Sequence, residues 1–278
     1  MSKSENPEYV LGHSERELER LIEQAAFFGD LTAHTLRLAG LQPGMRVLDL
    51  GCGAGDVSFL AAAIVGATGQ VVGADQNADA IKLATGRADA AGLSSRVSFT
   101  IGDITQLPYR QEFDAVIGRL VILYLGDQAA GVRAFANYVK RDGIIYFQEF
   151  CAPGSSAIPA VPLYDECIGW INTAFERAKI NLYTGMHLGR IYLDAGLPMP
   201  RMLGMARVEG GETSHVYTYI TETVRSLIPL LERTGAASAA DIGIDTLAGR
   251  LKEQSLARGA VLHAPELIAA WTRRPPAQ

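Results

Sequence analysis

The stretch that decides the fold is Val47-Leu48-Asp49-Leu50-Gly51-Cys52-Gly53-Ala54-Gly55. Its first half is apolar and predicts a buried strand, and three glycines at alternate positions follow. Glycine lets the backbone turn tightly and come close to a ligand. Doubly wound sheets bind their ligands at the carboxyl ends of the strands. The stretch therefore predicts a strand, a ligand-binding loop and then a helix.

The segments around this loop alternate between apolar runs and helical patterns. The runs predict strands at 45–50, 70–75, 96–101, 113–118 and 143–150, and the patterns predict helices at 14–40, 56–66, 77–91 and 127–139. Parallel strands that are covered on both faces read as continuous apolar runs. The alternation therefore predicts an α/β fold, with a doubly wound, mostly parallel sheet between two layers of helices.

After residue 150 the rhythm changes. Residues 151–162 predict a loop, 162–180, 184–196 and 214–257 predict helices, and 202–208 predict a strand. Residues 266–273 fit either a strand or a short helix. This half combines the completion of the sheet with inserted helices, which we expect to form a cap.

Composition limits the classes of partner. The chain has 278 residues, 48% of them apolar and 20% charged, and a net charge of -5, which indicates a globular protein without the basic surface that nucleic acid requires. Cys52, Cys151 and Cys167 match neither a zinc pattern nor a disulfide framework. The N-terminus is polar and the apolar runs are short, so we expect a cytoplasmic protein that does not interact with membranes.

The loop also limits the class of ligand. Counted from Gly51, the third glycine of a dinucleotide motif would fall on Asp56, whose charge would repel a pyrophosphate at a helix N-terminus. The Gly-Lys-Ser/Thr of a P-loop is absent. Asp75 ends the second strand and could accept hydrogen bonds from ribose hydroxyls, and Asp103 follows the third, where an adenine amino group could reach it. The pattern favours an adenosine ligand without phosphates.

On these residues, 45–150 resemble the small-molecule branch of the class I S-adenosylmethionine-dependent methyltransferases. Phe113-Asp114-Ala115-Val116 before strand four also matches, whereas Arg141-Asp142-Gly143 stands where the family often has Pro-Gly-Gly. The resemblance implies a seven-stranded Rossmann-like sheet whose last strand is antiparallel. It divides the chain into an N-terminal helical lid (1–40), a cofactor-binding core (41–150), and cap insertions with completion of the sheet (151–278).

The resemblance also implies roles for cofactor-binding residues. The glycine loop and Arg119 would line the methionine part of S-adenosylmethionine, with Asp49 near its ammonium group. Asp75 and Gln76 would bind the ribose, and Asp103 and Ile104 the adenine. The implied set is Asp49, Gly51, Gly53, Gly55, Asp75, Gln76, Asp103, Ile104 and Arg119.

Methyl transfer from a sulfonium is an in-line displacement, in which the protein supplies position, water exclusion and sometimes a base. Glu149 ends strand five and is the first candidate for that base, although a salt bridge to Arg119 or a loop hydrogen bond would also explain it. His187 is the second candidate. Candidate substrate-lining residues are Phe28, Trp170, Tyr183 and His215. The histidines show no metal-binding spacing, so we expect no metal.

The sequence thus predicts a methyltransferase acting on a small molecule, such as a natural product, through an oxygen, nitrogen or carbon nucleophile. A homodimer is the default expectation. One alternative is an NAD(P)-dependent oxidoreductase, which the missing third glycine and the lack of a Tyr-x-x-x-Lys pair disfavour. A non-catalytic protein that binds an adenosyl cofactor stays open as the other.

Overall fold

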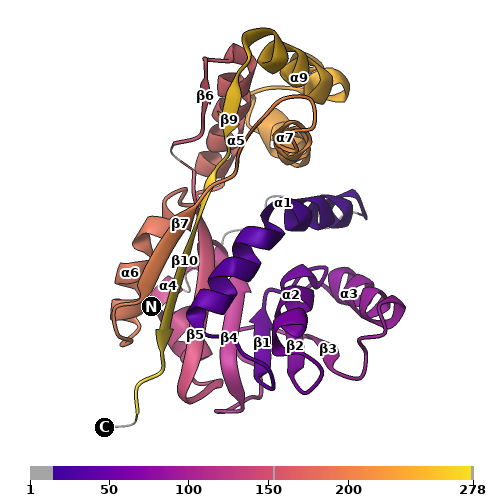
Figure 1. Ribbon diagram of the computed structural model, residues 1–278. Coiled ribbons are helices and arrows are strands. Elements are labelled where there is room, and N and C mark those ends of the chain that lie inside the picture. The colour runs from indigo at the N-terminus through magenta and orange to yellow at the C-terminus, as the bar shows by residue number, and fades with distance from the viewer. Residues whose placement is uncertain (1–14, 153, 277–278) are drawn as a thin grey trace.

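A computed structural model describes residues 15–152 and 154–276, with the side chains of the first helix described from Gln24 onward. Its main feature is a seven-stranded sheet in the order β3-β2-β1-β4-β5-β10-β7. The strands are β1 (Arg46–Leu50), β2 (Gln70–Asp75), β3 (Val97–Ile101), β4 (Phe113–Arg119), β5 (Val139–Cys151), β7 (Arg201–Met205) and β10 (Glu266–Arg273). Figure 1 shows this sheet with helices on both sides.

The strand directions match the predicted fold. β1 is parallel to β2 and β4, β2 to β3, and β4 to β5, whereas β10 is antiparallel to both β5 and β7. The doubly wound, mostly parallel sheet with an antiparallel last strand is therefore confirmed. Because β1 has neighbours reached by crossovers in opposite directions, its carboxyl end is the switch point where such sheets bind ligands.

Helices cover both faces of the sheet. Apolar side chains of α1 (Glu15–Ala39) and α2 (Asp56–Val65) pack on one face, and those of α4 (Gln128–Ala136) and α6 (Thr184–Asp194) pack on the other. The next helix after α2 is α3 (Ala78–Ala90), which packs beside β2 and β3. The central strands β1 and β4 are apolar over most of their length because both of their faces are buried.

A second apolar cluster forms the cap, which stands beyond the carboxyl ends of the parallel strands (Figure 1). It joins α5 (Pro162–Arg177), α7 (Val216–Arg233), α8 (Ala239–Ile242) and α9 (Leu247–Arg258) to a three-stranded sheet. The small sheet has the order β6-β9-β8 and is built from β6 (Ser156–Ile158), β9 (Val261–His263) and β8 (Val208–Gly210). The helical cap that the sequence predicts is thus present, with a sheet on one side.

Several boundaries differ from the sequence prediction, and β5 begins at Val139, where the predicted helix at 127–139 was expected to end. The expected loop at 151–162 contains β6, and the expected strand at 202–208 is divided between β7 and β8. The expected helix at 214–257 is interrupted, because Gly235 takes a φ of 68° and Ser238 then begins α8 with a capping box. Residues 266–273 form a strand. The predicted lid at 1–40 corresponds to α1 in its described part, and residues 1–14 lie outside the described residues.

Candidate cofactor and acceptor site

The glycine loop turns sharply at the carboxyl end of β1. Gly51, Gly53 and Gly55 have φ values of 63°, 51° and 87°, in the left-handed region that favours glycine. A Cβ atom on Gly51 would lie 2.7 Å from Cγ2 of Val121, so a side chain there would collide as well as strain the backbone. Glycine is therefore required at Gly51 by both the backbone conformation and the space available.

Asp75 lies against this loop, as the sequence predicts. Its Oδ2 accepts a hydrogen bond from the Gly53 amide at 2.9 Å, and its Oδ1 accepts one from the Asn77 amide at 2.9 Å. The Asn77 side chain in turn caps α3. Gln76, between them, is exposed. The acid at the end of β2 is therefore held beside the loop in a fixed orientation.

Asp49 is a buried carboxylate behind the loop, 1% exposed. It accepts a hydrogen bond from Ser58 Oγ at 2.6 Å. Burial raises its pKa to about 7, although the Ser58 hydrogen bond and the charge of Arg119 oppose the rise, while Asp75 and Asp56 add to it. A cation bound near the loop would therefore hold Asp49 in its charged form.

Asp56 does not stand alone as the sequence argument assumed. Arg87 on α3 forms an ion pair with its Oδ1 at 2.7 Å and also donates to the Ala54 carbonyl at 2.6 Å. The guanidinium lies 5.2 Å from the centre of the Phe59 ring. Arg87 thus links α3 to the glycine loop and balances part of the negative charge of Asp56.

Asp103 and Ile104 follow β3 at the same edge of the sheet. The Asp103 carboxylate is exposed and accepts hydrogen bonds from the amide and hydroxyl of Thr105, at 2.9 and 2.7 Å, and from Gln106 Nε2 at 2.7 Å. Partial burial would raise its pKa, but these hydrogen bonds outweigh that effect and lower it. Asp103 is therefore an ionised acceptor at the position predicted for an adenine amino group.

Comparison with known proteins identifies the family. The model of a family described as "Methyltransferase domain" matches residues 41–180, which is half of the chain. The chain belongs to this methyltransferase domain family. Membership confirms that residues 41–180 form a methyltransferase domain, as the sequence predicts.

Individual relatives of this methyltransferase domain match less completely. The ubiquinone/menaquinone biosynthesis C-methyltransferase UbiE of Ectopseudomonas mendocina is 33% identical over 128 residues, which is 46% of this chain and 50% of that protein. The chain spans about half the length of the curated relatives it matches.

Solved structures resemble the methyltransferase chain over a longer stretch. A Bacillus halodurans protein described as a putative methyltransferase has a TM-score of 0.58 at 17% identity, covering 88% of this chain and 99% of its own. A Haemonchus contortus phosphoethanolamine N-methyltransferase, solved with S-adenosylhomocysteine, has a TM-score of 0.55 at 17% identity, covering 89% of this chain and 53% of its own. At these identities the likeness shows the fold alone.

Glu149, the predicted base of the methyltransferase, lies fully buried at the end of β5. Its Oε1 accepts hydrogen bonds from the amides of Val121 and Ile122, at 2.9 and 2.7 Å, at the start of the 3-10 helix η1 (Ile122–Tyr124). Burial raises its pKa to about 8 despite these hydrogen bonds. This geometry matches the loop hydrogen bond that the sequence left open, and a role as base stays a prediction.

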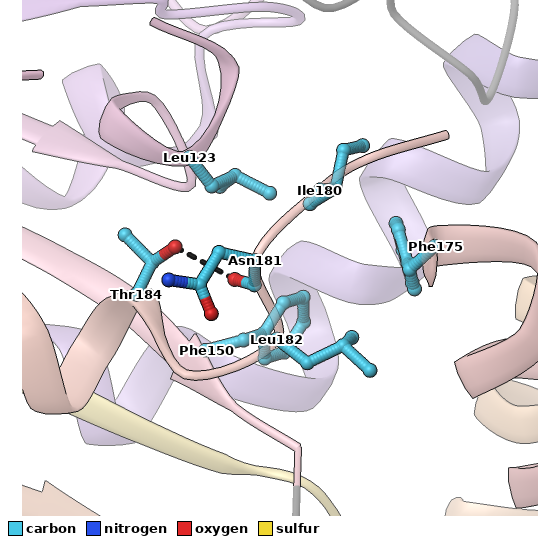
Figure 2. Close-up of a pocket in the computed structure, with 7 residues that line it drawn as sticks. All are labelled: Leu123, Phe150, Phe175, Ile180, Asn181, Leu182 and Thr184. Carbon is cyan, nitrogen blue, oxygen red and sulfur yellow. Dashed lines mark hydrogen bonds between the residues drawn. The ribbon is translucent and has the colours of Figure 1, made fainter. Parts of the chain in front are cut away.

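A small hollow of about 10 Å³, room for roughly one water molecule, lies between the core and the cap. Figure 2 shows its walls, which come from η1, the end of β5, α5 and the segment that leads into α6. Its lining is mainly apolar, with two polar residues; the set is Leu123, Phe150, Phe175, Ile180, Asn181, Leu182 and Thr184. Thr184 Oγ1 donates to the Asn181 carbonyl at 2.7 Å, so the hydroxyl proton of that residue is already used.

The remaining predicted residues do not line this hollow. Phe28 is fully buried and Trp170 is half-buried against the cap core. Tyr183 is 50% exposed. His187 and His215 are exposed as well, and His187 Nδ1 lies 2.8 Å from Asn181 Nδ2. The roles proposed for these residues stay predictions.

The described residues offer neither a metal site nor a membrane-spanning helix. Within 15–152 and 154–276, no group of three or more His, Cys, Asp and Glu side chains could hold a metal ion. None of the helices in the described part of the methyltransferase is long and apolar enough to cross a membrane.

Sequence reasoning missed several residues that complete this site. Ser58 and Arg87 hold the loop, and Thr32 of α1 contacts Gln148 at the end of β5. Gln148 alone left a signal, because it interrupts an apolar strand. The hollow under the cap left none, because its lining residues come from four separate elements.

Proposed function

We propose that this chain is an S-adenosylmethionine-dependent methyltransferase whose acceptor is a small, mainly apolar molecule held between the core and the cap. One observation carries the proposal: three carboxylates, those of Asp49, Asp56 and Asp75, surround the glycine loop. Asp56 forms an ion pair with Arg87, and the charge of Arg119 acts on Asp49. Such a field favours a sulfonium and an ammonium group and opposes a pyrophosphate.

The residues present fit that cofactor. The positive φ values of the loop glycines place the loop backbone at the carboxyl end of β1, and Asp75 presents a fixed carboxylate to a ribose. Asp103 offers acceptor oxygens to an adenine amino group. When bound, S-adenosylmethionine supplies an electrophilic methyl carbon. The chain itself contributes position and, through the cap, exclusion of water.

The acceptor class follows from the hollow under the cap. Five of its seven lining residues are apolar, which favours an apolar ring or chain with one polar group, and the hollow has to widen to admit such an acceptor. The curated relatives are named as C-methyltransferases of ubiquinone and menaquinone biosynthesis, which agrees with an apolar acceptor. The family model ends at residue 180, so most of the cap lies outside the matched residues.

Two ligands test the cofactor. Calorimetric titration should show binding of S-adenosylhomocysteine and none of NADH. Asp75→Ala should weaken the former roughly tenfold or more, because it removes a carboxylate that hydrogen-bonds the ligand. Asp79→Ala, at an exposed position in the first turn of α3, is the matched control. Binding of NADH instead would overturn the proposal.

Methyl transfer needs its own assay. Methyl-labelled S-adenosylmethionine should label an apolar phenol, quinol or amine from a panel, and NMR of the product would identify the methylated atom. Labelling of charged, strongly hydrophilic acceptors in preference to apolar ones would contradict the proposed acceptor class.

A further inference from the structure

A polar layer lies beneath α1 at the carboxyl ends of β4 and β5. Arg119 and Gln148 are register partners in these parallel strands, so their side chains lie next to each other on the same face. Thr32 of α1 joins them, because its hydroxyl donates to Gln148 Oε1 at 2.8 Å and accepts from Arg119 Nη1 at 3.1 Å. α1 is thus fastened to both strands through one hydroxyl group.

This arrangement leaves one buried donor without a partner. Gln148 is fully buried, and among the described residues its Nε2 atom has no hydrogen-bond partner. The Thr32 hydroxyl accepts from Arg119 and gives its proton to Gln148 Oε1, and with this bond Nε2 is the unsatisfied end of the amide. Buried polar groups in native proteins are nearly always paired, so an orphan of this kind calls for a ligand atom.

The groups next to Gln148 Nε2 indicate which chemical group of a ligand would pair with it. Arg119 is half-buried beside Gln148, so a guanidinium and an amide N–H stand side by side as donors. Two adjacent donors, one of them charged, match the two oxygens of a carboxylate. On the neighbouring strand β1, Asp49 offers the opposite charge, and its register partner in β4 is Ile117, two residues before Arg119. The layer thus has an acceptor for an ammonium and donors for a carboxylate.

We propose that Gln148, together with Arg119, binds the carboxylate of the methionine part of S-adenosylmethionine, and that Thr32 orients the Gln148 amide for this contact. The inference rests on the proposed function. It assigns Gln148 to the cofactor site and makes Thr32 a positioning residue. It also couples the docking of α1 to the presence of an amino-acid carboxylate in the ligand.

A pair of ligands isolates the contact. S-adenosylhomocysteine has the carboxylate, and S-adenosyl-3-thiopropylamine lacks that group alone. Gln148→Leu removes the amide at similar volume and should weaken S-adenosylhomocysteine about ten- to a hundredfold, the range for a hydrogen bond to a charged group. Binding of the decarboxylated ligand should change less than twofold.

Variants in α1 distinguish the orienting of the Gln148 amide by Thr32 from a general destabilisation of the helix. Thr32→Val should show the same selectivity with a smaller loss, because Gln148 remains but its amide is no longer held. Thr35→Val is the matched control, since Thr35 lies on the same helix and contacts the Tyr146 hydroxyl at 2.7 Å instead. It should affect both ligands equally.

The outcomes are distinct. If Gln148→Leu weakens both ligands equally, or neither, the carboxylate contact is wrong. If the unaltered protein binds neither ligand, the proposed function itself fails. If circular dichroism shows that Gln148→Leu does not fold, Thr32→Val decides with the same two ligands, and equal losses there overturn the proposal.

Discussion

Replacing Glu149 by Gln should remove the pH dependence of stability that the buried Glu149 carboxyl group causes. The carboxyl group is fully buried, its Oε1 accepts the amides of Val121 and Ile122, and its Oε2 has no partner among the described residues. Burial raises its pKa from 4.5 to about 8. Gln keeps the shape and the accepting oxygen but does not titrate, so the two proteins differ mainly in one proton.

The sign and size follow from linkage. Between pH 4.5 and about 8 the native carboxyl keeps a proton that the unfolded chain has lost, so stability falls as pH rises through this window. At about 1.36 kcal/mol per pH unit the whole effect is at most about 5 kcal/mol. Between pH 5 and pH 8 the stability of the unaltered protein should fall by about 3.5 kcal/mol relative to Glu149→Gln.

Urea unfolding of both proteins at half-unit steps from pH 5 to pH 8 would measure this difference. Other titrating groups, including Asp49, are common to both proteins and cancel in it. Glu253→Gln, at an exposed position on α9, is the control and should give a flat difference. A difference for Glu149→Gln that stays within about 1 kcal/mol over this range would show that Glu149 remains ionised in the fold, and the argument from burial would be wrong.

Three further outcomes are expected. Arg87→Leu should lower the free energy of unfolding by about 1–3 kcal/mol in urea titrations, because it breaks a partly buried ion pair and leaves the Ala54 carbonyl without its donor. An unchanged free energy of unfolding would contradict the role of Arg87 in holding the glycine loop. Leu182→Trp should fill the hollow and suppress acceptor methylation while S-adenosylhomocysteine binding, measured by calorimetry, changes less than twofold. Asp103→Asn should weaken that ligand roughly tenfold, and equal loss of a ligand lacking the adenine amino group would refute the contact.

The core of the fold was predictable because its signals are local. Apolar runs mark β1, β2, β4 and β5, and the glycines after β1 mark the loop, since a positive φ leaves few alternatives to glycine. The three-residue strands β6, β8 and β9 were not predictable. They are too short to show a period, and they pair residues more than fifty positions apart in sequence, as between Ala157 and Leu262.

The site was predictable only where side chains follow directly from a strand end. Asp75 and Asp103 lie at the sheet edge as expected, because the position of a strand fixes that of the residue after it. Glu149 also lies at a strand end, but its surroundings come from the turn after β4, which the sequence could not place. Thr32 and Gln148 meet across 116 residues, and no local pattern reports such a contact.

The choice of ligand at the loop finally depends on a contact rather than on charge alone. From the sequence, Asp56 was expected to repel a pyrophosphate, but Arg87 pairs with that carboxylate. Asp75 instead discriminates against a phosphate-containing ligand. Its Oδ2 already accepts the Gly53 amide hydrogen bond that a phosphate at this loop would need. A phosphate would have to displace a carboxylate from its hydrogen bond and then lie beside it, at a cost of like-charge repulsion. A ribose needs no such displacement, because its hydroxyls can donate to the same carboxylate, whose oxygens each have a second lone pair.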